Sequence, residues 1–126
     1  MARTTPEILV VDDEPEVCWA LSWLFHTKGY PACAVQSGAE ALAALGRKAF
    51  THILLDAKLQ DWDGLALAAE ARTRNPGAVV LLISAYFYRD DPDIARALAA
   101  GHIDGFISKP FTHAEILRCI SPQVTE

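Results

Sequence analysis

The sequence lacks the features of disulfide-stabilised secreted proteins and of membrane proteins. Its three cysteines, Cys18, Cys33 and Cys119, are far apart and form neither a Cys-x-x-Cys pair nor a zinc-type spacing with histidine. They therefore indicate reduced thiols in a cytosolic protein. No apolar stretch approaches the ~20 residues needed to span a bilayer, and residues 1–7 contain no signal-peptide core. We expect a cytoplasmic protein with no membrane partner.

Clustered positive charge is also scarce. The chain has 11 Lys and Arg against 16 Asp and Glu, a formal net charge of −5, and its basic residues are scattered apart from Arg47 beside Lys48. Nucleic acids and anionic membranes are bound through clustered Lys and Arg side chains. The composition therefore argues against direct binding to nucleic acid.

The length and composition fit one globular domain. With 126 residues, of which 52% are hydrophobic and 21% charged, the chain should bury roughly two thirds of the surface that it exposes when unfolded. It contains no internal repeat, low-complexity segment or linker. We predict a single domain over residues 1–126, with its core at about residues 7–121.

Short apolar runs alternate with segments of helical periodicity along the whole chain. Strands are predicted at residues 8–11, 30–35, 53–55, 78–83 and 105–108. Helices are predicted to begin near Pro15, Ser37, Gly64, Asp90–Pro92 and Thr112, and the second is expected to stop at Gly46. This order predicts an α/β fold in which helices cover both faces of a doubly wound, five-stranded parallel sheet. Because the strands are apolar throughout, we expect them to be buried on both faces.

Polar residues that phosphoryl chemistry can use stand where four of these strands end. Asp12 and Asp13 follow the first strand, Asp56 the third, Ser84 the fourth and Lys109 the fifth. The carboxyl ends of parallel strands share one edge of a sheet, where open α/β sheets bind ligands. Packed carboxylates repel one another unless a divalent cation joins them, and oxygen ligands suit Mg2+. The pattern predicts a magnesium and phosphate site around Asp56.

Each of these residues can be given a chemical role. Asp56 can act as a nucleophile toward phosphorus, and Lys109 can neutralise charge on the transferring group. Ser84 can donate a hydrogen bond to a phosphoryl oxygen, as can the backbone N–H of Ala85. Taken singly, each residue is explained as well by a helix cap, a turn or a surface charge. The functional interpretation depends on their coincidence at the ends of neighbouring strands.

The motifs at these strand ends resemble the receiver domain of two-component response regulators, over nearly the whole chain. They are Val10-Val11-Asp12-Asp13-Glu14, Asp56 followed by Asp63-Gly64, Ser84-Ala85, and Lys109-Pro110-Phe111. The resemblance implies a flavodoxin-like fold and a phosphoryl group that passes to Asp56 from a histidine kinase or a histidine phosphotransfer protein. It also implies that the protein catalyses only its own phosphorylation and dephosphorylation and is otherwise not an enzyme.

The resemblance further implies a set of Mg2+ ligands. Asp13 and Asp56 would bind the ion, Asp12 would bind it directly or through water, and the backbone carbonyl of Lys58 would complete the set. Lys109 would contact the phosphoryl group. In relatives the bond between this lysine and the following proline is often cis.

The switch residues are also implied by the resemblance. Ser84 would move toward the phosphoryl group, and its motion would be coupled to Phe106, an aromatic residue on the fifth strand. The surface around Phe106 would then bind a downstream protein or a second copy of the chain. Lys58 and Tyr86 occupy positions that tune the phosphoryl lifetime in relatives, and we expect Tyr86 to shield the acyl phosphate from water.

Several positions depart from the family pattern. Gln60 stands where proline is usual and Trp62 where methionine is common, which leaves open how rigid the loop after Asp56 is. Trp62 could cover the site or pack against the neighbouring helix. The segment after Ser84 is longer than usual, and residues 86–88 are all aromatic.

Other functional classes fit less well. An aspartyl-nucleophile phosphatase would carry a second Asp two residues after Asp56, where this chain has Lys58. A non-phosphorylated interaction domain of the same fold commonly loses acidic or lysine positions that are present here. A flavin-binding protein would need a phosphate-cradling loop after the first strand, where the acidic residues 12–14 would repel phosphate.

Overall fold

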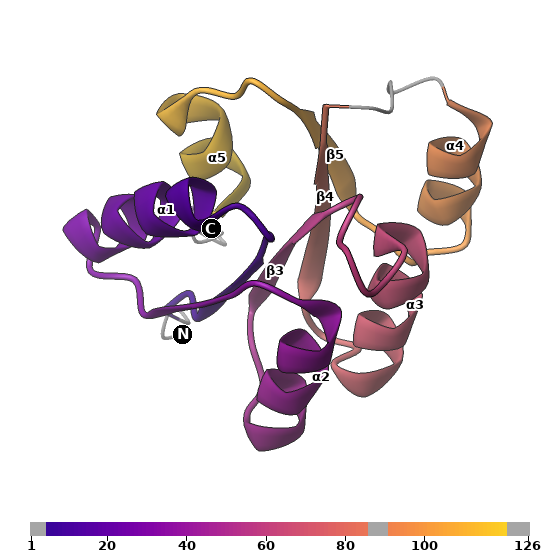
Figure 1. Ribbon diagram of the computed structural model, residues 1–126, viewed down its shortest axis with the longest axis horizontal. Coiled ribbons are helices and arrows are strands. Elements are labelled where there is room, and N and C mark those ends of the chain that lie inside the picture. Colours follow the sequence, from indigo (N-terminus) through magenta and orange to yellow (C-terminus); the bar gives the residue numbers. More distant parts are fainter. Residues whose placement is uncertain (1–4, 86–90, 121–126) are drawn as a thin grey trace, which may run out of the picture.

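The structure is a computed structural model and describes residues 5–85 and 91–120. Within them, five strands alternate with five helices (Figure 1). The strands are β1 (Ile8–Val11), β2 (Ala32–Val35), β3 (His52–Asp56), β4 (Val79–Ser84) and β5 (Gly105–Ser108). The helices are α1 (Pro15–Thr27), α2 (Gly38–Arg47), α3 (Gly64–Arg74), α4 (Pro92–Ala99) and α5 (His113–Ile120). This alternation confirms the predicted α/β fold.

The strands form one parallel sheet in the order β2-β1-β3-β4-β5. The register aligns their ends: Val11 lies opposite both Val35 and Leu55, and Ser84 lies opposite Ser108. The chain first winds from β1 outward to β2 and then continues on the other side of β1 with β3. Such a reversal opens a crevice at the carboxyl ends of the two central strands. The doubly wound topology therefore positions a site beyond β1 and β3.

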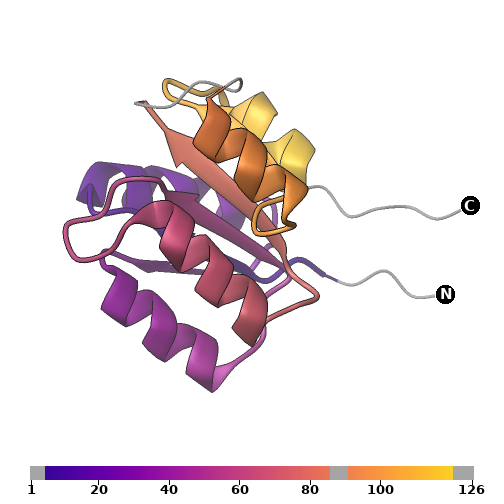
Figure 2. The ribbon, with the colours of Figure 1, turned by 90° about the vertical axis from the view of Figure 1, so that its right-hand side faces the viewer.

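Two helical layers cover the sheet. Adjacent strand residues point to opposite faces, as Leu54 and Leu55 of β3 show. Leu55 belongs to the core cluster shared with α2, α3 and α4, whereas Leu54 belongs to the cluster shared with α1 and α5. Figure 1 shows the two groups of helices on either side of the sheet, and Figure 2 looks from the side of α2, α3 and α4. The predicted cover on both faces is confirmed for the sheet as a whole.

The helices begin where local sequence signals predict. Pro15 is the first residue of α1, where its missing N–H has no helical partner to lose. At α2, the side chain of Ser37 accepts a hydrogen bond from the Glu40 N–H at 3.1 Å. At α5, the Glu115 N–H donates to Thr112 Oγ1 at 3.1 Å, while the Thr112 N–H donates to Glu115 Oε1 at 2.8 Å. This reciprocal pair is a complete capping box.

Several details differ from the predictions. β3 extends one residue beyond the predicted range 53–55 at each end, and β4 lies one residue later than the predicted range 78–83. β2 begins at Ala32 rather than at residue 30, and its residues alternate between exposed and half-buried. It is an edge strand with a neighbour on one side only, so its apolar composition does not bring burial on both faces. Gly46 does not stop α2, because its φ is not positive and the Lys48 N–H still donates to the Ala44 carbonyl at 3.2 Å.

The helices are short compared with a bilayer. The longest within the described ranges, α1, has 13 residues, whereas a transmembrane helix needs ~20. None of the helices in residues 5–85 and 91–120 combines the length and the hydrophobicity needed to cross a membrane.

Candidate functional site

Three aspartates lie together at the carboxyl edge of the sheet. Asp12 and Asp13 directly follow β1, and Asp56 is the last residue of β3. One carboxylate oxygen from each lies within 4.8 Å of the other two. Asp12 and Asp56 are buried, with 2% and 6% exposure, and Asp13 is half-buried. The parallel pairing of β1 with β3 therefore brings together side chains that are 43 to 44 residues apart in sequence.

Lys109 brings a positive charge to these carboxylates. It follows β5, and its Nζ lies 3.0 Å from Asp12 Oδ2 and 3.8 Å from Asp56 Oδ2. A third acidic side chain, Glu14, also contacts it, with Oε1 at 3.0 Å from Nζ. The peptide bond from Lys109 to Pro110 is cis, as the resemblance to receiver domains implies. In this state, then, one ammonium group is shared among three carboxylates.

Burial and mutual repulsion alter how easily these groups ionise. Burial raises the pKa of Asp56 to about 6, and the charge of Asp12 adds to the increase, although Lys109 opposes it. Burial also raises the pKa of Asp12, against the hydrogen bonds from the Glu14 N–H and from Lys109. Burial disfavours the charged form of Lys109, but Glu14, Asp12 and Asp56 outweigh it and hold the lysine pKa above its ordinary value. The cluster is thus short of positive charge.

This set of donors suits a hard divalent cation. Mg2+ prefers oxygen ligands and binds through one or two carboxylates together with water and substrate oxygens. Asp12, Asp13 and Asp56 offer such oxygens, and Lys109 offsets only part of their charge. Lys58, whose backbone carbonyl is the fourth predicted ligand, lies two residues after Asp56, and its N–H is 3.4 Å from Asp56 Oδ1. The residues present therefore fit Mg2+.

A cavity of about 600 Å3 opens beside the cluster, and its lining includes Asp56, Lys58, Ala85 and Lys109. Ser84 is the last residue of β4 and is completely buried. The pairing of Asp56 with the residue before Ser84 places the two strand ends side by side. The structure thus gathers Ser84 and Ala85 at the same edge as the aspartates and the lysine.

One of the predicted switch residues, Phe106, lies in the core rather than at this edge. Phe106 is 5% exposed and belongs to the core cluster on the side of α2, α3 and α4, so its ring does not form part of the surface in this state. It pairs with Leu82, two residues before Ser84 on the neighbouring strand. Tyr86 lies outside the described residues, as does the rest of the aromatic segment after Ala85.

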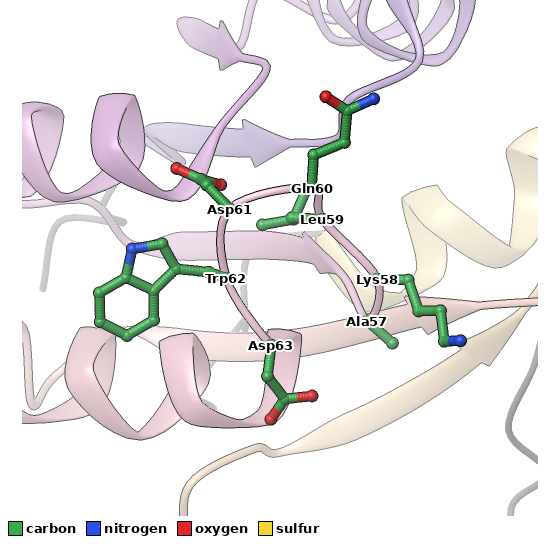
Figure 3. Close-up of a pocket in the computed structure, with 7 residues that line it drawn as sticks. All are labelled: Ala57, Lys58, Leu59, Gln60, Asp61, Trp62 and Asp63. Atoms are coloured by element: carbon green, nitrogen blue, oxygen red, sulfur yellow. The ribbon is translucent and has the colours of Figure 1, made fainter.

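The loop from Ala57 to Asp63, which directly follows Asp56, closes on itself (Figure 3). Lys58 and Asp63 form an antiparallel bridge, and the Gly64 N–H donates to the Ala57 carbonyl at 2.9 Å. A Cβ on Gly64 would lie 2.5 Å from the Ala57 Cα, so only glycine allows this close approach of the two backbone segments. The Asp63 side chain also caps α3 by accepting from the Ala66 N–H at 3.1 Å.

Two residues at the site were missed from the sequence. Glu14 binds Lys109 across 95 positions of sequence, and the only local signal was its place directly after the two aspartates. Asp61 binds the N-terminus of α2, more than 20 residues earlier, without any local signal. The structure also shows that Trp62 lies against Gly38 of α2, which is the packing alternative rather than a cover over the site.

Comparison with known proteins agrees with this geometry. The family model for the response regulator receiver domain matches residues 8–121. The probable transcriptional regulatory protein TcrX of Mycobacterium tuberculosis and the transcriptional regulatory protein ZraR of Salmonella typhimurium are both 34% identical to the chain over 110 residues. Each match covers 87% of this chain but only 46% of TcrX and 24% of ZraR. The chain thus spans about half of one relative and a quarter of the other.

Solved structures share the fold. A CheY-like receiver domain protein from Methanospirillum hungatei is 23% identical, with a TM-score of 0.83 and coverage of 91% of this chain and 90% of that one. A response regulator from Burkholderia pseudomallei, which contains a phosphorylated aspartic acid and a calcium ion, is 25% identical, with a TM-score of 0.82 and coverage of 92% and 66%. A response regulator from Thermotoga maritima in complex with Mg2+ and BeF is 27% identical, with a TM-score of 0.77 and coverage of 90% and 95%.

Proposed function

Because the chain belongs to the response regulator receiver family, we propose that it is the phosphoryl-accepting module of a two-component system and that Asp56 is the acceptor. The observation that carries the proposal is the buried carboxylate of Asp56, held among Asp12, Asp13 and Lys109 at the carboxyl edge of the sheet. The phosphorylated aspartic acid of the Burkholderia pseudomallei relative supports the same chemistry. We also propose that residues 1–126 form a single receiver domain and that the protein works in the cytoplasm.

The proposed reaction is a phosphoryl transfer between side chains. A carboxylate oxygen of Asp56 attacks the phosphorus of a phosphohistidine on a histidine kinase or a phosphotransfer protein. A P–O bond forms while the P–N bond breaks, and the histidine nitrogen takes back the electron pair and then a proton. With its pKa at about 6, Asp56 is mostly ionised near neutral pH and has the electron pair available. The product is an acyl phosphate on this chain, so the only reactions that the protein catalyses are its own phosphorylation and dephosphorylation.

We assign the metal site to Asp12, Asp13, Asp56 and the backbone carbonyl of Lys58. Mg2+ bound there supplies positive charge that offsets the repulsion between these carboxylates and an incoming phosphoryl group. Lys109 supplies a second positive charge that offsets this repulsion, because its ammonium group lies 3.8 Å from Asp56. Positioning and charge neutralisation account for nearly all of the catalysis that phosphoryl transfer requires.

We assign signal relay to Ser84, Ala85 and Phe106. A phosphoryl group on Asp56 would accept hydrogen bonds from the Ser84 hydroxyl and the Ala85 N–H. Since Ser84 ends β4 and Phe106 lies on the paired strand β5, a shift of Ser84 would disturb the packing of the buried ring. The surface of α4, β5 and α5 would then change its affinity for a downstream protein or a second copy. We also assign control of the acyl-phosphate lifetime to Lys58 and Tyr86.

Intact mass after incubation with Mg2+ and acetyl phosphate tests the acceptor. We expect the wild type to gain one phosphoryl group and Asp56→Asn to gain none, since the amide lacks the nucleophilic oxygen. Asp93→Asn, an equivalent change on the exposed surface of α4, should behave as the wild type. Chelation of Mg2+ should abolish the gain.

The other outcomes are equally informative. Phosphorylation of Asp56→Asn would place the acceptor on another residue. If the wild type gains no phosphoryl group and also fails to bind Mg2+, the protein is a non-phosphorylated interaction domain that keeps the receiver fold.

A further inference from the structure

The tip of the loop after Asp56 is tied to a different part of the chain. Asp61 Oδ1 accepts a hydrogen bond from the Gly38 N–H at 2.9 Å, and Oδ2 accepts from the Ala39 N–H at 3.0 Å. Both amides belong to the first turn of α2, where backbone N–H groups have no helical partner. These two hydrogen bonds hold the pKa of Asp61 below its ordinary value. The carboxylate therefore remains ionised and bound to α2 at neutral pH.

The next residue reinforces this contact. Trp62 packs so closely on Gly38 that a Cβ there would lie 2.3 Å from the indole Cδ1. Figure 3 shows Trp62 and Lys58 leaving the loop on opposite sides, with Asp61 near the top of the loop on the side of Trp62. The indole is half-buried and packs against the core cluster on the side of α2 and α3. Two adjacent residues of the tip thus bind α2, one by hydrogen bonds and one by packing.

The opposite end of the same loop carries a proposed metal ligand. Lys58 stands at the base, where it pairs with Asp63 in an antiparallel bridge. Asp61 at the tip is only three residues further along the chain, so the orientation of the intervening peptide groups depends on where the tip is held. The loop over residues 57–63 contains no proline that would restrict its backbone. The contacts of Asp61 and Trp62 with α2 are therefore the restraints on the loop tip that the structure shows.

We propose that Asp61 is a positioning residue for the metal site: by tying the loop tip to the N-terminus of α2, it holds the Lys58 carbonyl in place as a ligand for Mg2+. This inference rests on the proposed function, because it presupposes that the cluster around Asp56 binds Mg2+. It assigns to α2 a part in metal binding, although α2 contributes no ligand of its own.

The test is a titration with MgCl2 followed by amide NMR shifts in the wild type, Asp61→Ala and Ser37→Ala. Ser37→Ala is the matched control, because it removes the other side-chain cap of α2, on the Glu40 N–H, and leaves the loop untouched. We expect Asp61→Ala to bind Mg2+ about tenfold more weakly, at the lower end of the range for residues that support metal ligands. Ser37→Ala should bind Mg2+ as the wild type does.

A second signature separates positioning from a general loss of stability. In the wild type, Mg2+ should shift the amide resonances of Gly38 and Ala39, although neither is a ligand, and in Asp61→Ala these shifts should vanish. Asp61→Asn is included in case the alanine variant folds poorly. It keeps one oxygen that can accept a hydrogen bond from α2, so it should bind Mg2+ more tightly than Asp61→Ala does.

Equal Mg2+ affinity in Asp61→Ala, Asp61→Asn and the wild type would overturn the inference while leaving the proposed function intact. So would an equal loss of affinity in Ser37→Ala, since the effect would then arise from α2 stability alone. A wild type that binds no Mg2+ would overturn the proposed function itself and the inference with it.

Discussion

Replacing Asp56 by Asn should make the metal-free protein more stable. Asp56 is 6% exposed, and its carboxylate lies among the carboxylates of Asp12 and Asp13. Ionisation of Asp56 therefore costs free energy in the folded state that it does not cost in the unfolded chain. Asparagine has nearly the same shape and carries no charge, so it removes this cost.

The magnitude follows from the pKa of Asp56. Burial, with help from Asp12, raises it from 3.8 to about 6, which corresponds to a cost of at most about 3 kcal/mol once the group is ionised. The folded state holds the Asp56 proton more tightly than the unfolded state does. Protonated Asp56 therefore stabilises the folded state, and this stabilisation is fully present below pH 3.8. It is lost as the pH rises through about 6. At pH 7.5 in EDTA, Asp56→Asn should thus melt roughly 10 °C higher than the wild type.

Thermal unfolding at two pH values checks this reasoning. Near pH 4 the wild-type carboxyl is protonated in the folded state, so the advantage of Asp56→Asn should nearly disappear. Saturating Mg2+ at pH 7.5 should raise the Tm of the wild type more than that of the variant, because the ion binds the folded carboxylates. Asp93→Asn, which removes an exposed charge, should show no comparable gain.

Either of two results would refute the argument. If Asp56→Asn is no more stable than the wild type at pH 7.5, then burial and repulsion do not make the ionisation of Asp56 costly in the folded state. If the gain is the same at both pH values, it does not come from the charge.

Two further predictions follow from contacts around the site. Glu14→Gln should increase the rate of phosphorylation by acetyl phosphate about twofold to fivefold, because it removes a negative charge and a competitor for Lys109. The rate is followed by intact mass, and an unchanged rate would show that the ion pair between Glu14 and Lys109 has no influence on phosphorylation. Gly38→Ala should lower the free energy of unfolding in urea by about 1–2 kcal/mol, since a Cβ there collides with Trp62, although alanine favours helices. In a Trp62→Ala background the same change should stabilise, and a loss there would place its cause outside the collision.

The chemistry-bearing residues could be found from the sequence because parallel sheets follow simple rules. Asp12, Asp56, Ser84 and Lys109 each stand at the end of an apolar run, and parallel strands bring such ends to one edge. The Thr112 capping box could be found because a cap is a contact within four residues of chain. The stop expected at Gly46 is wrong because glycine permits a helix end without requiring one.

Contacts between distant segments were beyond such rules. The bond of Asp61 to α2 joins residues 22 and 23 positions apart, and that of Glu14 to Lys109 joins residues 95 apart. Neither contact leaves a periodic pattern in the sequence. An acidic side chain on a loop or at a helix start is usually solvated, so its residue type alone does not indicate a distant partner. The exposure of β2 depends likewise on its place at the edge of the sheet.

The sequence by itself determined the order of strands and helices, the family and the edge at which the site lies, because these depend on local periodicity and on residues at strand ends. Only the tertiary structure decided which groups share the charge of Lys109, how far burial raises the pKa of Asp56, and which helix holds the loop beside it. Electrostatic and packing energies depend on distances between side chains, and the distances arise only when the sheet and its helices close around the site.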